Sequence, residues 1–133
     1  MKDPTINYLT WAARLIAALI MLQTLYFKFT GASESVEIFT RVGMEPWGRF
    51  GVGTMELIAS ILILIPATSW IGAGLALGLM LGAIGMHLTI LGIEVQGDGG
   101  YLFFLALLVS ICSAFILWVN KEVLLTFVKK VFK

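Results

Sequence analysis

The sequence predicts an all-α polytopic membrane protein, a bundle of four transmembrane helices in a single domain over residues 1–133. Two observations predict this fold class. Hydrophobic residues make up 59% of the chain and charged residues 13%, whereas soluble domains carry about a quarter charged residues. Four apolar runs are each close to the ~20 residues with which a helix crosses the hydrocarbon core; they cover residues 6–28, 47–65, 70–91 and 101–119.

The segment around the first loop also has predicted structure. Run 6–28 is too long for the apolar part of a signal peptide and lacks a small-residue cleavage site, so we expect it to stay as a transmembrane helix. Ser33 favours the start of a short surface helix over residues 33–42. Pro46 suits the first turn of the second crossing, at residues 47–65.

Small residues recur at every fourth position in the last two apolar runs. This spacing lets the backbones of two transmembrane helices approach closely. We interpret these residues as helix-packing contacts; they are Gly74, Gly78, Gly82, Ala106 and Ser110.

Residues 121–132 form an amphipathic, basic segment with its lysines largely off the apolar face. Such a segment is typical of a helix that lies on an anionic membrane surface. The sequence leaves open whether it continues the fourth helix or bends away from it.

Basic residues predict the orientation of the bundle. Four crossings place both termini on one side, and the cytoplasmic side carries the excess of Lys and Arg. The ends of the chain carry five such residues and the first loop three, namely Lys2, Lys121, Lys129, Lys130 and Lys133 against Lys28, Arg41 and Arg49. Both termini are therefore expected in the cytoplasm. We interpret Arg14 as a structural or interfacial charge whose long side chain reaches the inner interface, and counting it supports the same orientation.

Several classes of protein are disfavoured. Cys112 is the sole cysteine, so an intrachain disulfide and a Cys-x-x-Cys redox relay are excluded. A net charge of +1 without a basic face gives no support for nucleic-acid binding. With one histidine in the chain, no metal site is expected.

Polar residues near the outer ends of the first three helices predict a pocket. Gln23 and Lys28 lie near the outer end of the first helix, Glu56 about two turns below the start of the second, and His87 about a turn from the end of the third. Asp98 stands in the loop above them. A carboxylate at this depth costs about 2.5 to 3.5 kcal/mol on insertion scales, so Glu56 should face the bundle interior.

The role of this cluster has two interpretations. Glu56 could pair with Lys28 or His87, and less readily with Arg14, which belongs to the inner half. In the functional interpretation the cluster handles a ligand or protons. In the structural one it is a satisfied network that orders the bundle.

The chain resembles the DoxX family of small four-helix bacterial inner-membrane proteins over nearly its whole length. The residues that carry the resemblance are Arg14, Lys28, Gly43, Met55–Ile58, Pro66, His87 and Gly97–Tyr101. The resemblance implies a multi-pass protein of the bacterial inner membrane. The family name comes from a subunit associated with a thiosulfate:quinone oxidoreductase, and distant relatives include a chaperone for receptor assembly. Members often carry an acidic residue after Gly-Gly-Tyr; Leu102 stands there in this chain, which puts a pocket contribution from the fourth helix in doubt.

Two functions of different class follow. In the first, the protein is a quinone- or lipid-associated accessory subunit of a membrane redox partner, with Glu56, His87 and Lys28 lining its site. In the second, it is a non-enzymatic scaffold or assembly factor that acts through helix packing with a partner or with a second copy. The expectation leans against catalysis by the isolated chain and leaves open a role as a subunit of a quinone-linked oxidoreductase.

Overall fold

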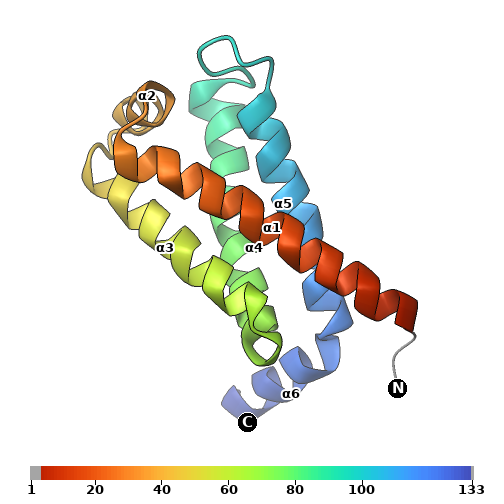
Figure 1. Cartoon of the computed structure of the whole chain (residues 1–133). Coiled ribbons are helices and arrows are strands. Elements are labelled where there is room, and N and C mark those ends of the chain that lie inside the picture. Colours follow the sequence, from red (N-terminus) through yellow and green to blue (C-terminus); the bar gives the residue numbers. More distant parts are fainter. Residues whose placement is uncertain (1–3, 133) are drawn as a thin grey trace.

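The computed structural model describes residues 4–132, which form four long helices with a short helix at either end of the bundle (Figure 1). The long helices are α1 (Pro4–Thr30), α3 (Trp47–Leu64), α4 (Ser69–Met86, continued by the π-helix His87–Leu91) and α5 (Tyr101–Val119). Within the described residues, these four are long and apolar enough to cross a membrane. The predicted fold class, an all-α polytopic bundle, is confirmed.

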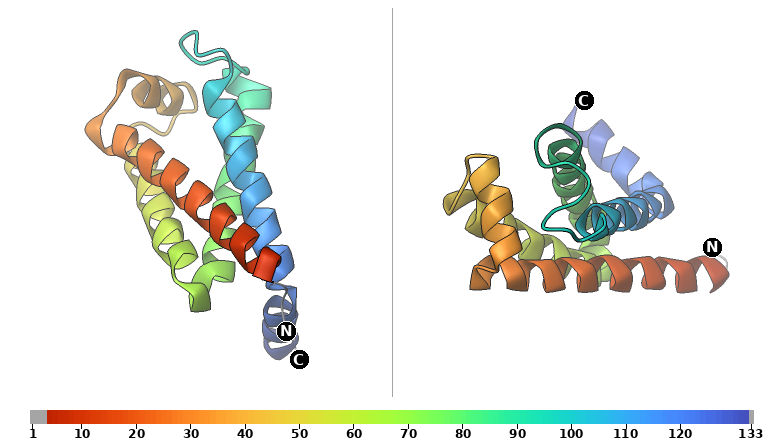
Figure 2. Two further views of the ribbon diagram at one scale, coloured as in Figure 1. Left: turned by 45° about the vertical axis from the view of Figure 1, so that its right-hand side comes forward. Right: turned by 90° about the horizontal axis from the view of Figure 1, so that it is seen from above.

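The four long helices pack as a ring. α1 contacts α3 and α5, and α4 contacts the same two helices from the other side. Small buried side chains hold the centre, with Ala17, Ala59, Ala73 and Ala76 fully buried, so the backbones approach closely there. Toward the α2 end (Ser33–Arg41), the α1–α3 pair diverges from the α4–α5 pair (Figure 2).

The glycine stripe of α4 is not a helix contact within this chain, so that part of the packing prediction is wrong. A Cβ atom added at Gly74, Gly78 or Gly82 would meet no described atom within 4 Å. The close contact is instead at Gly72, where a Cβ would lie 2.7 Å from the carbonyl oxygen of Ala59. The helix turns its alanine face toward its neighbours, which leaves the glycine face open.

Ala106 and Ser110, the two small residues of α5 that were predicted to pack against another helix, differ in burial. Ala106 is buried in the core. Ser110 is half-buried and its hydroxyl donates to the Ala106 carbonyl of its own helix at 2.8 Å. Of the two, Ala106 is the core contact.

Arg14 binds the end of a neighbouring helix. Its Nε and a terminal nitrogen donate to the carbonyl oxygens of Ile63 and Leu64, each at 2.7 Å. These carbonyls belong to the last turn of α3, where the backbone lacks partners within the helix. The guanidinium also lies 3.7 Å from the ring centre of Trp11. Arg14 is therefore a structural charge at the end of the bundle opposite α2.

Two further arginines act in the same way at the α2 end. Arg41 donates to the carbonyls of Ile90 at 2.9 Å and Leu91 at 3.3 Å, where the π-helix ends. Arg49 donates to the carbonyl of Lys28 near the end of α1. Guanidinium groups thus satisfy the last carbonyls of helices that would otherwise end without partners.

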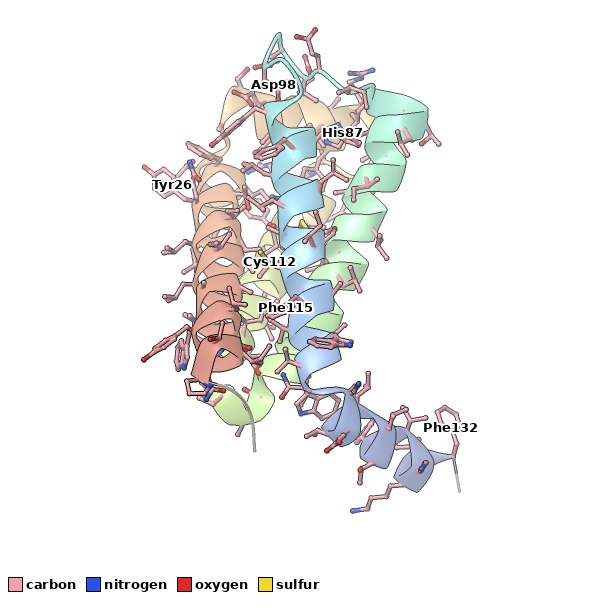
Figure 3. All side chains as sticks on the ribbon, turned by 90° about the vertical axis from the view of Figure 1, so that its right-hand side faces the viewer. Tyr26, His87, Asp98, Cys112, Phe115 and Phe132 are labelled. Carbon is pink, nitrogen blue, oxygen red and sulfur yellow. The ribbon has the colours of Figure 1, made fainter. Side chains whose placement is uncertain are left out.

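The basic segment forms a separate helix, α6 (Lys121–Val131), that bends away from α5 after Asn120. In Figure 3, Phe132 lies just beyond α6 at one end of the bundle. His87 and Asp98 lie at the opposite end, and Cys112 lies between the two ends. The ring of Phe127 packs on Trp70 with 5.4 Å between centroids. α1 begins and α6 ends at the same end of the bundle (Figure 1); Lys2 and Lys133, counted in the orientation argument, lie outside the described residues.

Candidate ligand-binding site

A cavity of about 570 Å³ lies where the two helix pairs diverge at the α2 end. Every residue predicted for the pocket lines it, namely Gln23, Lys28, Glu56, His87 and Asp98. They come from α1, α3, the π-helix after α4, and the loop before α5. Their shared depth, counted in residues from the ends of the apolar runs, is what led us to expect them in one pocket.

The charged centre of the cavity is a buried ion pair between α1 and α3. The Lys28 ammonium lies 2.8 Å from Oε1 of Glu56, and the side chains are 16% and 2% exposed. The hydroxyl of Thr24, one turn before Lys28 on the same face of α1, lies 3.1 Å from Oε2 of Glu56 and 3.0 Å from the carbonyl oxygen of Met21, so the two oxygens share its one proton. Thr24 was not among the predicted residues; its spacing of four from Lys28 was the available signal.

The ion pair encloses the carboxylate of Glu56 between α1 and α3. Although Lys28 Nζ is close to Glu56 Oε1, no residue in the described range donates to that oxygen with hydrogen-bond geometry. The ammonium compensates the charge, but its contact does not use the oxygen's lone pairs in a directed bond. Glu56 is therefore a buried charge that is compensated inside the bundle by Lys28.

His87 opens the π-helix, a distortion that is frequent at functional sites. The side chain is 5% exposed and its Nδ1 lies 2.9 Å from the carbonyl oxygen of Gly92. Since a carbonyl only accepts, Nδ1 carries a proton and donates it to Gly92. The ring also packs edge-on against Phe103, with 5.5 Å between centroids. His87 is therefore held by Gly92, and the partner of Glu56 is Lys28.

Asp98 organises the rim of the cavity. Oδ1 accepts the backbone N–H groups of Val95 at 3.1 Å and Gly100 at 2.8 Å, and Oδ2 that of Leu102 at 3.3 Å. Desolvation by burial raises the pKa of Asp98, but the backbone N–H donors outweigh it and the net pKa is lowered. The carboxylate thus fixes the loop at the start of α5.

Other residues that line the cavity were predicted from the sequence to have a different role or no role in a pocket. Gly78 and Gly82, predicted for packing, line the cavity, and their missing side chains leave its space open. From α5, Leu102 and Leu105 contribute apolar surface. Gln23 lines the cavity from an exposed position on α1.

The deeper wall of the cavity is apolar. Ile20 and Met21 lie about two turns of α1 from Lys28, or roughly 12 Å toward the middle of the bundle. Met80 from α4 joins them there. The cavity is therefore divided into a polar end near α2 and an apolar end at mid-depth.

Comparison with known proteins places the chain in a family. A model described as the DoxX-like family matches residues 12–115, a region that runs from α1 to α5 and includes the whole polar cluster. No curated protein and no solved structure matches the chain. With its four membrane-spanning helices and a family match over most of its length, this chain is a multi-pass integral membrane protein that belongs to the DoxX-like family.

Proposed function

We propose that this protein binds the head of a membrane-soluble quinone-type compound in the cavity, as an accessory subunit of a membrane redox partner. The observation that carries the proposal is the division of the cavity. Lys28, Glu56 and His87 offer hydrogen-bonding groups at the α2 end, and apolar side chains line the mid-depth end. A polar ring with an alkyl tail has the same division.

The family supports a quinone as the ligand, because the DoxX name comes from a subunit associated with a quinone-linked oxidoreductase. The chain itself has the groups to bind and orient a ring, and electron transfer is assigned to the partner. A phospholipid with a polar headgroup shares the amphipathic division and is the competing ligand.

We place the cavity at the outer face of the bacterial inner membrane, with both termini in the cytoplasm. The lysines of α6 support this orientation, because Lys121, Lys129 and Lys130 lie at the end of the bundle opposite the cavity.

The glycine face of α4 provides a matched test. Gly78→Leu with Gly82→Leu adds two large side chains to the cavity wall, whereas Gly74→Leu with Gly85→Leu adds the same volume to positions outside the cavity. At each of the four positions an added Cβ meets no described atom within 4 Å, so in both pairs the new side chain starts in open space.

Native mass spectrometry of the detergent-purified protein, with quinones and lipids retained, would report the ligand. We expect the parent and the Gly74/Gly85 variant to retain a quinone and the Gly78/Gly82 variant to lose it. Retention of the same quinone by the Gly78/Gly82 variant would contradict the proposal, and retention of phospholipid in its place would favour the competing ligand.

One observation favours the second function, a scaffold that packs against a partner helix. Gly74 and Gly85 are exposed on α4 and line no part of the cavity, so a partner backbone could approach them closely. In that case the Gly74/Gly85 variant, and not the Gly78/Gly82 variant, should lose a copurified partner or a second copy in the same measurement.

A further inference from the structure

We infer that a second cavity, at the end of the bundle opposite α2, binds the phosphate group of an anionic phospholipid. This cavity has a volume of about 360 Å³. Its polar lining comes from α1, the start of α4 and the end of α5, and consists of Asn7, Thr10, Arg14, Ser69 and Asn120. Among the described residues it shares no lining residue with the cavity at the α2 end, so this inference is independent of the proposed function.

Arg14 brings a positive charge to this cavity that no described acid compensates. A guanidinium stays protonated in proteins, and this side chain is 4% exposed. Its hydrogen-bond partners, the carbonyls of Ile63 and Leu64, carry partial charges only. The two ion pairs of the described residues do not include it, and Glu122, two residues after the cavity lining, is exposed and lines no part of the cavity. An anion in the cavity would compensate the charge.

One nitrogen of the guanidinium is available to such an anion. Nε and Nη2 of Arg14 donate to α3, whereas Nη1 makes no hydrogen bond with a described residue. Nη1 is also not one of the fully enclosed side-chain atoms without a partner, which in the described range are Glu56 Oε1 and Ser113 Oγ. It therefore keeps surface at the cavity, where a phosphate oxygen can accept its N–H in a charge-assisted hydrogen bond.

The protein holds the binding groups in place before a ligand arrives. The two bonds to α3 fix the guanidinium, so binding does not have to order a long side chain. On the other side of the cavity, α4 begins at Ser69, and no side chain caps this helix N-terminus. The partial positive charge of a helix N-terminus favours an anion. It adds to the full charge of Arg14 at the same cavity.

The position of the cavity favours a lipid phosphate over a free one. Its lining lies at the ends of membrane-spanning helices, at the level of the lipid headgroups. Trp11, which packs on the guanidinium and is 44% exposed, is of a residue type enriched at that level. The amide nitrogen of Asn120 donates to the carbonyl of Ile116, which leaves its amide oxygen to accept a headgroup hydroxyl. Phosphatidylglycerol offers both a phosphate and hydroxyl groups.

The test on the parent chain compares two lipids that differ in the phosphate. The full-length protein, stripped of lipid in detergent, is titrated with phosphatidylglycerol or with diacylglycerol of the same acyl chains, and bound lipid is measured by native mass spectrometry. A hydrogen bond to a charged group contributes about 1.5–3 kcal/mol. Phosphatidylglycerol should therefore bind roughly tenfold or more tightly than diacylglycerol. Equal binding of the two lipids would overturn the inference.

Two substitutions at Thr10 place the lipid at Arg14. Thr10→Asp adds a carboxylate one turn before Arg14 on the same face of α1, where it can pair with the guanidinium and exclude the phosphate. Thr10→Asn has the same shape without the charge. We expect Thr10→Asp to lower binding of phosphatidylglycerol to the level of diacylglycerol and Thr10→Asn to bind like the parent. Arg14 itself is left intact, because its substitution would also remove the bonds to α3.

Thr30→Asp is the matched control for net charge. Thr30 lies at the other end of α1 and lines neither cavity. Its hydroxyl donates to the carbonyl four residues earlier, at Tyr26, as that of Thr10 does at Ile6. This variant should bind phosphatidylglycerol like the parent. Equal binding by the Thr10→Asp and Thr10→Asn variants, or an equal loss in Thr30→Asp and Thr10→Asp, would contradict a site at Arg14.

Three further measurements exclude other sources of the signal. Loss of phosphatidylglycerol in Gly78→Leu with Gly82→Leu, and not in Thr10→Asp, would assign the lipid to the cavity at the α2 end. Binding of inorganic phosphate in lipid-free detergent, without retention of phosphatidylglycerol, would overturn the lipid as its source. Asp3 lies outside the described residues, and Asp3→Asn should leave binding unchanged; a gain of tenfold or more would identify Asp3 as the counter-ion of Arg14 and overturn the inference.

Discussion

Gly72 offers the sharpest test of the helix packing. A Cβ at this position would lie 2.7 Å from the carbonyl oxygen of Ala59 and 2.7 Å from the amide nitrogen of Ile63. Ordinary contact begins at 3.4 Å, so the α3 and α4 backbones would have to separate by about 0.7 Å. Because both close atoms belong to the backbone of a packed helix, no side-chain rotation relieves the contact.

The expected cost follows from two opposing effects. Overpacking of this kind typically lowers the free energy of unfolding by about 1–3 kcal/mol. Replacing glycine by alanine within a helix raises it by about 0.5–1 kcal/mol. Gly74→Ala gains the same propensity and meets no described atom within 4 Å. The difference between the variants therefore isolates the packing term, and Gly72→Ala should be less stable than Gly74→Ala by about 1–3 kcal/mol.

Unfolding in mixed micelles titrated with dodecyl sulfate, followed by circular dichroism, would measure this difference. Both variants carry one added methyl group on the same helix, so changes in micelle binding should cancel between them. If the two unfold at the same detergent fraction, the close approach of α3 and α4 at Gly72 is not present in the folded protein.

Three further outcomes are expected from the charged residues. Glu56→Leu should cost about 3–5 kcal/mol in the same unfolding assay because Lys28 is left uncompensated, and Lys28→Met in the same chain should restore much of it; strictly additive losses would mean that the two are not partners. Because the folded pKa of Asp98 is lowered, its contribution to stability is present above the unfolded pKa of about 4 and is lost as pH falls through the lower folded value. Melting temperatures of the parent and Asp98→Asn should therefore converge on acidification, and a constant gap would contradict the assignment. Lys129→Glu with Lys130→Glu should reduce the anionic lipids that copurify in native mass spectrometry, since each lysine near such a surface contributes about 1 kcal/mol; an unchanged lipid profile would argue against α6 as a lipid-binding helix.

Hydropathy predicted the fold class because a chain in hydrocarbon must satisfy its backbone internally, which leaves helices as the solution for apolar runs of this length. The face that each helix turns inward was less predictable. α4 carries small residues on two faces, and only the packed structure shows that Ala73 and Ala76 are buried while the face of Gly74, Gly78 and Gly82 is open. A hydrophobic pattern cannot distinguish two faces that are both apolar and small.

The sequence predicted the depth of the site residues in the membrane, but not which of them are in contact. Counting residues from the helix ends brought Lys28, Glu56 and His87 to one level, because the rise per residue is constant. Which of them touch depends on the rotation of each helix and on local distortions. The π-helix at His87 turns its ring toward Gly92, and no periodicity in the sequence reports such an insertion.

The contact of Arg14 with α3 has a consequence for the order of events during membrane insertion. Chains are synthesised from the N-terminus, so α1 enters the bilayer before α3 does. Until α3 arrives, the guanidinium must reach the lipid headgroups, and an arginine at mid-membrane would carry a penalty of about 2.5–3.5 kcal/mol. The guanidinium lies against Trp11, about one turn closer to the start of α1, so the side chain extends toward that interface. α1 therefore brings Arg14 into the membrane ahead of its partners, and the hydrogen bonds to Ile63 and Leu64 form when α3 is inserted.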